Sequence, residues 1–367
     1  MAFSEVKKNF GFGAMRLKMR GEEVDLQEFS RMIDAFIAAG FNYFDTAHGY
    51  IGGKSELAIG ECLSARYRRE DFVLANKLSE WYIEKAEDII PYFEAQLKAC
   101  RVGYFDFYLC HSVNRKNYEK YKACRAFEII SELKAQGKVR HMAISFHDTA
   151  DVLDKILSEQ PAIEAVQLQI NYLDYDDPGV QSRACYDVAV KHGKKVIVME
   201  PVKGGALVNL PKEGAELIES LGGGSPASYA LRYAASLPEV FMVLSGMKDL
   251  PMVEENVRTM GNFLPLTERE EAALSEVRAI IRRAAQIGCT GCNYCAEVCP
   301  KGIKISSIFD VANKVSAAKI TRSAAAELMP SEGERAADCI KCGACERVCP
   351  QNIGIREKLE EIAEKIK

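Results

Sequence analysis

Two short runs of cysteine near the C-terminus have a spacing that can hold a metal centre. They contain, in chain order, Cys289, Cys292, Cys295 and Cys299, and then Cys339, Cys342, Cys345 and Cys349. In each run the first three cysteines recur at every third position, and a proline follows the fourth. Three thiolates at that spacing on a tightly wound loop can grip one face of a cuboidal cluster. The fourth then points away, and the proline redirects the chain toward a second cluster.

Both runs fit C-x2-C-x2-C-x3-C-P, the bacterial ferredoxin pattern, in which the fourth cysteine ligates the other cluster. By that resemblance one [4Fe–4S] cluster is held by Cys289, Cys292, Cys295 and Cys349, and the other by Cys339, Cys342, Cys345 and Cys299. Zinc is the main alternative, because C-x2-C pairs also build zinc ribbons. A zinc site needs only four ligands, however, and does not explain a repeated pattern of three evenly spaced cysteines, a fourth and a proline.

Residues 300–338 separate the runs by more than in the smallest two-cluster ferredoxins. Within them, SSIFDVANKVSAAK and TRSAAAELM have the periodicity of amphipathic helices. This arrangement resembles the larger, helix-rich ferredoxin domains that are fused to redox enzymes. We therefore expect a small, mainly α-helical, ferredoxin-like domain that binds two clusters.

Four ionisable residues in the first third of the chain come at the ends of apolar segments. Asp45 and Tyr50 lie in NYFDTAHGY, Lys77 in FVLANKL and His111 in FYLCHS. Each of them alone could be a solvated or structural residue. As a set they follow three successive segments, and a lysine that ends an otherwise apolar strand is unusual. The pattern favours a catalytic site.

FDTAHGY, followed by Gly53 and by Ser55-Glu56, and then the strand-end lysine and histidine, resembles the tetrad of the aldo-keto reductases. The resemblance covers about residues 9–262. It implies a (β/α)8 barrel and an NAD(P)H-dependent oxidoreductase that interconverts a carbonyl, aldehyde or ketone, and an alcohol by hydride transfer. Tyr50 is then the general acid and base.

The chemistry of carbonyl reduction needs this combination of residues. A free tyrosine has a pKa of about 10, too high for ready proton exchange near neutrality. We expect the ammonium group of Lys77 to lower the pKa of Tyr50, and Asp45 to hold Lys77 charged. His111 would orient the carbonyl and assist proton relay.

The same resemblance assigns residues to the nicotinamide cofactor. Ser145 and Gln167 match the residues that bind the carboxamide, and Met199 stands where the family usually has a stacking aromatic residue. Lys203 and Gly204 should lie near the pyrophosphate, and the adenosine segment contains Gly246, Lys248, Glu255 and Asn256. Two positions that carry a lysine and an arginine in NADPH-preferring members are Gly246 and Met252, so the choice between NADH and NADPH stays open. Expected substrate residues are Met15, Trp81 and Tyr82.

Eight strand-like segments must position these side chains. They are Phe10–Met15, Asn42–Ala47, Phe72–Leu78, Phe105–Ser112, Met142–Phe146, Ala165–Asn171, Val196–Glu200 and Phe241–Gly246. Eight helical patterns fill the gaps, at Asp25–Ala39, Ser55–Ala65, Glu84–Ala99, Tyr118–Ala135, Thr149–Ser158, Val180–His192, Pro226–Ala235 and Pro251–Met260.

This count and size are those of a (β/α)8 TIM barrel. A doubly wound open sheet is the alternative, but no G-x-G-x-x-G follows the first strand. We expect the barrel over residues 1–265, a linker helix over 266–285 and the two-cluster domain over 286–367.

Composition narrows the class of protein. The formal net charge is −4, with 48 basic and 52 acidic side chains, and no basic block argues for nucleic acid. The sequence contains no stretch of eighteen apolar residues, so no membrane span is predicted. The N-terminus lacks the apolar core of a signal peptide, so a cytoplasmic protein is expected. Five cysteines outside the runs are predicted to be core thiols, namely Cys62, Cys100, Cys110, Cys124 and Cys185.

Two functions fit this sequence. In the first, the barrel reduces a small-molecule carbonyl, and the clusters are structural, sensory or a docking site for a ferredoxin or flavoprotein. In the second, the chain is an iron–sulfur electron-transfer protein whose barrel binds nicotinamide nucleotide without significant turnover. Direct electron exchange is disfavoured, because nicotinamide gives two electrons as a hydride and a cluster accepts one.

Overall fold

The computed structural model describes residues 3–284, 287–316, 320–331 and 333–365. Its centre is a closed barrel of eight parallel strands in the order β1-β10-β9-β8-β7-β6-β5-β4. The barrel strands are β1 Phe10–Gly13, β4 Tyr43–Asp45, β5 Val73–Leu78, β6 Phe105–Val113, β7 Val139–Phe146, β8 Ala165–Gln169, β9 Lys195–Met199 and β10 Val240–Gly246. All eight predicted strands are present, and the barrel prediction is confirmed. A small hairpin of β2 (Met19–Arg20) and β3 (Glu23–Val24) was not predicted.

Alternation of side chains along the strands divides the core in two. One apolar cluster fills the barrel interior and includes Tyr43, Phe107, Ile197 and Met242. The larger cluster lies between the strands and the surrounding helices, and Phe36 of α1 is one of its fully buried members. The five cysteines predicted to be core thiols are all buried.

Helices surround the barrel. Their bounds are α1 Leu26–Ala38, α2 Lys54–Ile59, α3 Ile89–Cys100, α4 Arg115–Ala123, α5 Ala126–Ala135, α6 Ala150–Glu159, α7 Ser182–Lys191, α8 Lys212–Leu221, α9 Pro226–Ala235 and α10 Leu250–Gly261. The helix predicted over 118–135 is two helices, because Arg125 adopts a left-handed conformation with φ of 56°. Helix α8 was not predicted. Among the described helices, none is both long and apolar enough to cross a membrane.

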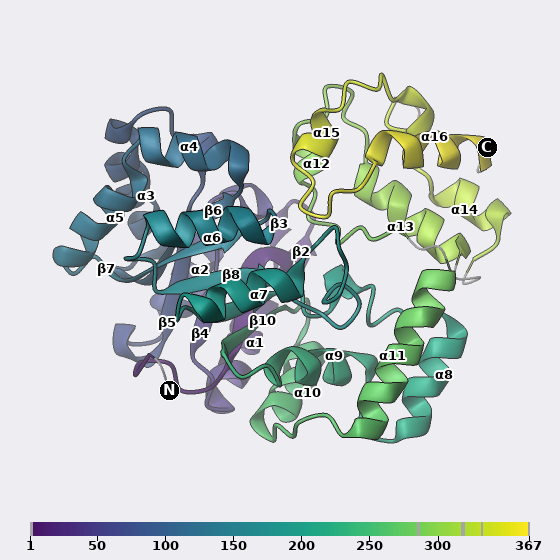
Figure 1. The fold of residues 1–367 in the computed structure, drawn as a ribbon, viewed down its shortest axis with the longest axis horizontal. Coiled ribbons are helices and arrows are strands. Elements are labelled where there is room, and N and C mark those ends of the chain that lie inside the picture. The colour runs from purple at the N-terminus through teal and green to yellow at the C-terminus, as the bar shows by residue number, and fades with distance from the viewer. Residues whose placement is uncertain (1–2, 285–286, 317–319, 332, 366–367) are drawn as a thin grey trace.

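Helix α11 (Glu268–Arg283) joins the barrel to the C-terminal region. It starts at Thr267, whose hydroxyl accepts from the amide of Glu270, and it packs beside α8, as Figure 1 shows. Leu274 and Val277 of α11 share an apolar cluster with Leu210 and Ile218. The predicted linker helix therefore rests on the barrel, while the exact domain boundaries stay a prediction.

The C-terminal region is mainly helical and lies against one side of the barrel (Figure 1). Its helices are α12 Tyr294–Glu297, α13 Ile305–Ser316, α14 Arg322–Leu328, α15 Ala344–Arg347 and α16 Ile355–Lys365. The two helical segments predicted between the cysteine runs correspond to α13 and α14, except that residues 317–319 lie outside the described residues.

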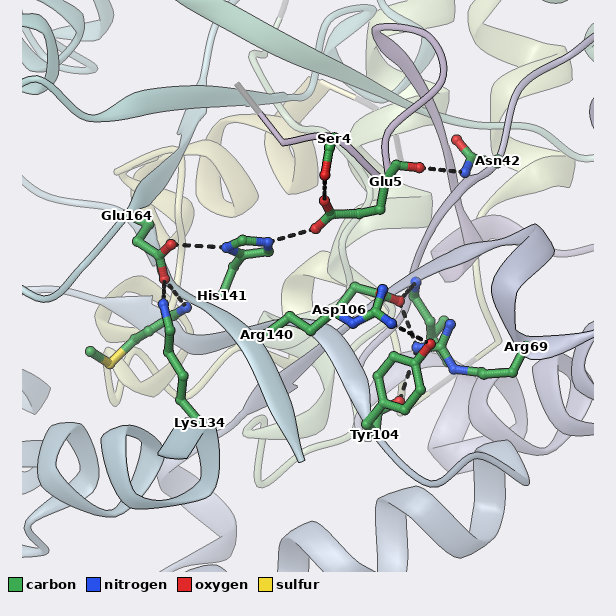
Figure 2. Close-up of polar contacts among 12 residues, drawn as sticks. Ser4, Glu5, Asn42, Arg69, Tyr104, Asp106, Lys134, Arg140, His141 and Glu164 are labelled. Carbon is green, nitrogen blue, oxygen red and sulfur yellow. Dashed lines mark hydrogen bonds and ion pairs between the residues drawn. The ribbon is translucent and has the colours of Figure 1, made fainter. Parts of the chain in front are cut away.

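A polar network closes the end of the barrel at which the strands begin (Figure 2). The ring of His141 lies between Glu5, 2.5 Å from Nε2, and Glu164, 2.9 Å from Nδ1. Asp106 accepts from Arg69 at 2.5 Å and from Arg140 at 2.9 Å. These ion pairs connect the segments at which β6, β7 and β8 begin, while the predicted site residues lie toward the opposite ends of their strands.

Candidate active site and cluster loops

The four ionisable residues predicted as a catalytic set come together at the ends of neighbouring strands. Asp45 ends β4, Lys77 lies in β5 and His111 lies in β6, while Tyr50 begins a short turn that follows β4. The carboxyl ends of barrel strands meet at one face. Asp45, Tyr50 and His111 line a single cavity of about 360 Å³ there, and Lys77 lies directly behind it.

Lys77 is fully buried and held by two acceptors. Its Nζ donates to Oδ1 of Asp45 at 2.6 Å and to the carbonyl of Thr46 at 2.9 Å. Burial lowers the pKa of Lys77 and raises that of Asp45, and the attraction between the two groups opposes both shifts. The short, charge-assisted hydrogen bond keeps the pair ionised. Lys77 is thereby fixed with its Nζ 4.8 Å from the centre of the Tyr50 ring.

Tyr50 is a neutral phenol in this arrangement. Burial raises its pKa well above the ordinary value, the carboxylates of Asp45 and Glu200 raise it further, and the Arg16 guanidinium opposes them only in part. We expected Lys77 to lower this pKa, but burial dominates and the net shift is upward. A neutral phenol still holds the proton that carbonyl reduction requires.

His111 is a neutral imidazole. Burial and the charge of Lys77 lower its pKa well below 6.5. Its Nδ1 lies 2.7 Å from Oγ of Ser79, and its ring centre is 6.0 Å from that of Tyr50. When Ser79 donates to Nδ1, the proton of the neutral ring resides on Nε2. His111 can then act as a hydrogen-bond donor into the cavity.

Ser55 and Glu56, which completed the sequence motif, form hydrogen bonds that fix the loop carrying Tyr50. Ser55 Oγ donates to the carbonyl of Ala14 at 2.8 Å and lies 2.7 Å from Oγ1 of Thr46. The buried carboxylate of Glu56 accepts from Asn76 at 2.8 Å and from Gln96 at 2.9 Å. These bonds tie the loop that carries Tyr50 to the strand that carries Lys77, so the motif has a positioning role.

Most residues predicted to bind the nicotinamide cofactor line the same cavity as Tyr50. They are Ser145, Gln167, Met199, Gly204, Gly246, Lys248, Glu255 and Asn256. The Oε1 atom of Gln167 is buried and has no hydrogen-bond partner among the described residues. An unpaired buried acceptor is costly unless a ligand satisfies it. Gln167 therefore fits a ligand that presents an N–H group, such as a carboxamide.

Lys203 does not line this cavity, and its charge is engaged elsewhere. Its Nζ donates to Oδ2 of Asp174 at 2.5 Å and to Oε1 of Gln351 at 3.1 Å. The adjacent Gly204 has φ of +61°, and a Cβ there would lie 2.1 Å from the carbonyl oxygen of Thr290. The group that comes close to the Gly204 backbone is thus Thr290 of the C-terminal region. Contact of Lys203 and Gly204 with a pyrophosphate stays a prediction.

The three predicted substrate residues are placed differently. Met15 lines the cavity. The Trp81 ring lies 5.1 Å from that of His111 and is 40% exposed. Tyr82 stacks on Tyr92 with ring centres 5.7 Å apart. Neither Trp81 nor Tyr82 is among the described residues that line the cavity, so their contact with substrate stays a prediction.

Sequence reasoning missed the residues that join the two parts of the chain around this cavity. Arg16 donates to the carbonyl of Thr290 at 2.6 Å and pairs with Glu200 at 3.4 Å. The amide groups of Gln169 and Gln351 bond to each other at 2.7 and 3.0 Å. Arg16 follows the first strand, where a charged residue could have signalled a site. The glutamines carry no comparable signal.

Four of the eight predicted cluster cysteines, drawn from both runs, lie around one small cavity. Cys299, Cys339, Cys342 and Cys345 line one small cavity. Burial raises the pKa of Cys295 to about 12, and the nearby thiols of Cys292, Cys289 and Cys349 add to the rise. Among the described side chains, no group of three or more His, Cys, Asp or Glu residues is arranged to hold a single metal ion.

The two cysteine loops repeat the same backbone. Gly291, Asn293 and Gly302 have positive φ in the first loop, as do Lys341, Gly343 and Asn352 in the second. The Sγ atoms of Cys289 and Cys339 each accept an amide N–H from the second residue onward at 3.4 Å. Successive amides aimed at one point form concave anion sites of the kind found at iron–sulfur clusters.

Comparisons with known proteins give one match over the barrel and another over the two cysteine runs. A model of the aldo/keto reductase family matches residues 9–279. A model of a 4Fe-4S dicluster domain matches residues 288–353. The barrel and the cysteine loops thus match two separate models.

Similar individual proteins extend over the barrel part of the chain. L-galactose dehydrogenase of Arabidopsis thaliana is 27% identical over 293 residues, which are 74% of this chain and 89% of that protein. The uncharacterized oxidoreductase YqkF of Bacillus subtilis is 23% identical over 66% of this chain and 85% of its own. A solved aldo-keto reductase from Bacillus halodurans, in its apo form, is 26% identical with a TM-score of 0.58, and covers 74% of this chain and 92% of its own.

Proposed function

The chain belongs to the aldo/keto reductase family and carries a C-terminal 4Fe-4S dicluster domain, and on that basis we propose that it interconverts a small carbonyl compound and the corresponding alcohol with NAD(P)H. The observation that carries the proposal is the convergence of Tyr50, His111 and the Lys77–Asp45 pair on one cavity. Gln167 Oε1, which has no hydrogen-bond partner within the described part of the chain, supports binding of the nicotinamide carboxamide in the same cavity.

The residues proposed to hold the cofactor line one cavity. Gln167 and Ser145 suit the carboxamide, and Met199 offers a polarizable thioether to the ring. Gly246, Lys248, Glu255 and Asn256 suit the adenosine end. When bound, the nicotinamide supplies the hydride.

Residues of the protein supply the proton that the carbonyl oxygen takes up during reduction. His111 Nε2 holds the carbonyl oxygen, and Tyr50 gives that oxygen its phenolic proton. The phenolate that forms is stabilised by the ammonium of Lys77, whose Nζ is 4.8 Å from the ring centre. Asp45 keeps Lys77 charged at 2.6 Å. In alcohol oxidation the same groups act in reverse.

We propose that the C-terminal domain binds two [4Fe–4S] clusters. Cys289, Cys292, Cys295 and Cys349 would hold the first, and Cys339, Cys342, Cys345 and Cys299 the second. A reduced ferredoxin or a flavoprotein is the proposed electron partner. Because Cys292 lines the reductase cavity, an electron-transfer protein that binds nucleotide without turnover is the second candidate function.

The test is turnover by the anaerobically purified holoprotein. NADH and NADPH oxidation would be followed against a panel of aldehydes and ketones, with iron and sulfide counted in the same preparation. Carbonyl-dependent oxidation of either nucleotide supports the reductase. Tight nucleotide binding without turnover on any carbonyl supports the electron-transfer protein instead.

A further inference from the structure

The reductase cavity is not formed by the barrel alone. Five residues of the C-terminal domain line it together with Asp45, Tyr50 and His111, and these are Thr290, Cys292, Tyr294, Pro350 and Gln351. Three of the five belong to the first cysteine loop. The mouth of the barrel is therefore completed in part by the first cysteine loop, which is also predicted to bind a cluster.

Tyr294 is the member of this loop that reaches the catalytic residues. Its hydroxyl lies 3.5 Å from Nε2 of His111. Its ring centre lies 6.1 Å from that of Trp81 and 6.4 Å from that of His111. The Nε2 atom that would hold the substrate carbonyl thus has the phenol of Tyr294 beside it.

The internal repeat shows that a cluster loop does not require this tyrosine. Cys292-Asn293-Tyr294-Cys295 in the first run corresponds to Cys342-Gly343-Ala344-Cys345 in the second. The residue before this position has positive φ in both loops, 67° at Asn293 and 74° at Gly343, and a short helix starts at the position itself, α12 and α15. Ala344, which occupies this position in the second loop, therefore shows that the fold of a cysteine loop does not need a tyrosine there.

We propose that Tyr294 is a substrate-positioning residue of the reductase, and that its hydroxyl selects carbonyl compounds with a second oxygen on the adjacent carbon. This inference rests on the proposed carbonyl–alcohol activity. When a substrate oxygen takes the N–H of His111, the hydroxyl of the half-buried Tyr294 loses that neighbour. A polar group left without a partner there is costly. A hydroxyl or oxo group next to the carbonyl supplies the partner.

The test compares matched substrates in wild type and in Tyr294→Phe, which removes only the hydroxyl. The pairs are hydroxyacetone with acetone, and lactaldehyde with propanal. Loss of one neutral hydrogen bond is expected to lower kcat/KM about tenfold for the hydroxylated member, mainly through KM. The member without the hydroxyl should change less than about twofold. An equal fall for both members of a pair would overturn the proposal.

A binding measurement separates this inference from the proposed function. Ligand-observed NMR on the holoprotein would compare 1,2-propanediol with 1-propanol, without turnover. Wild type should bind the diol about tenfold more tightly, and Tyr294→Phe and Tyr294→Ala should lose the preference with iron content unchanged. A diol preference in a protein that reduces no carbonyl would sink the proposed function, and would keep only the recognition of a second oxygen by the Tyr294 hydroxyl. No preference in wild type, or loss of iron in both variants, would refute the role.

Discussion

A side-chain carbon on Gly204 would lie 2.1 Å from the carbonyl oxygen of Thr290, so the barrel and the C-terminal domain meet backbone to backbone beside the active site. Arg16 and Lys203 reinforce this junction from either side by reaching Thr290 and Gln351. Because Thr290 lies between two predicted cluster ligands, the contact couples the cluster loop to the cavity wall.

Replacing Gly204 with alanine should separate the two domains. The variant carries the strain of a positive φ, about 1–2 kcal/mol, and in addition a clash with the backbone of Thr290. We expect faster limited proteolysis between the barrel and the first cysteine run, and a lower unfolding midpoint. Gly193→Ala is the matched control, since its φ of +66° is similar and no atom of the described residues lies within 4 Å of the added carbon. Equal behaviour of the two variants would contradict the contact.

Stability should depend on Glu270 above pH 4.5. Hydrogen bonds from Arg232 hold the pKa of Glu270 at about 2, below its ordinary 4.5, at the start of α11. A depressed folded-state pKa stabilises the protein above the unfolded value, and that contribution is lost as the pH falls from about 4.5 to about 2. Glu270→Gln should therefore be less stable than wild type at pH 7, and the difference should shrink with acid.

Urea unfolding at several pH values measures this difference. Any pH dependence of metal binding is common to both proteins and cancels in the comparison. Glu268→Gln, in the same helical turn but exposed, is the control and should show little change. A difference for Glu270→Gln that stays constant with pH would count against the ion pair.

Cysteine substitution should show that the clusters exchange ligands between the runs. Cys299 belongs to the first run but lines the cavity of the second, with Cys339, Cys342 and Cys345. In Cys299→Ser the iron content should fall from about eight to about four per chain, and the paramagnetic signal of one cluster should be lost. The cluster lost should be the same one that Cys342→Ser loses. Loss of the same cluster as in Cys292→Ser would show that each run binds its own.

The barrel was readable from the sequence because each strand is a short apolar run bounded by turn residues. Residues 105–113 are an example, since nearly all of them are buried in β6. The catalytic set could be predicted because Lys77 and His111 lie near the ends of predicted strands, and the carboxyl ends of barrel strands meet at one face. Local pattern failed at Arg125, where a single left-handed residue divides a continuous amphipathic segment into α4 and α5.

The junction between the domains could not be predicted by local pattern. Arg16 and Gly291 are 275 residues apart, and Gln169 and Gln351 are 182 apart. Neither residue of such a pair has a periodicity or a motif that names the other. The direction of the pKa shift of Tyr50 was not predicted for a related reason, since burial and the charge of Glu200 raise this pKa and neither can be read from the motif. One difference was visible in advance, namely Tyr294 in one run where the other has Ala344.

Transfer of isotope from the cofactor tests the central claim most directly. The holoprotein would reduce a carbonyl substrate with NAD(P)H deuterated at the transferred position, and mass spectrometry would locate the label in the alcohol. Direct hydride transfer in the Tyr50 cavity predicts deuterium on the carbinol carbon. It also predicts a rate about 10²–10⁴-fold lower in Tyr50→Phe, with nucleotide binding and iron content retained. Solvent hydrogen at that carbon, with an unchanged rate in Tyr50→Phe, would contradict the account and point to electron transfer through the clusters.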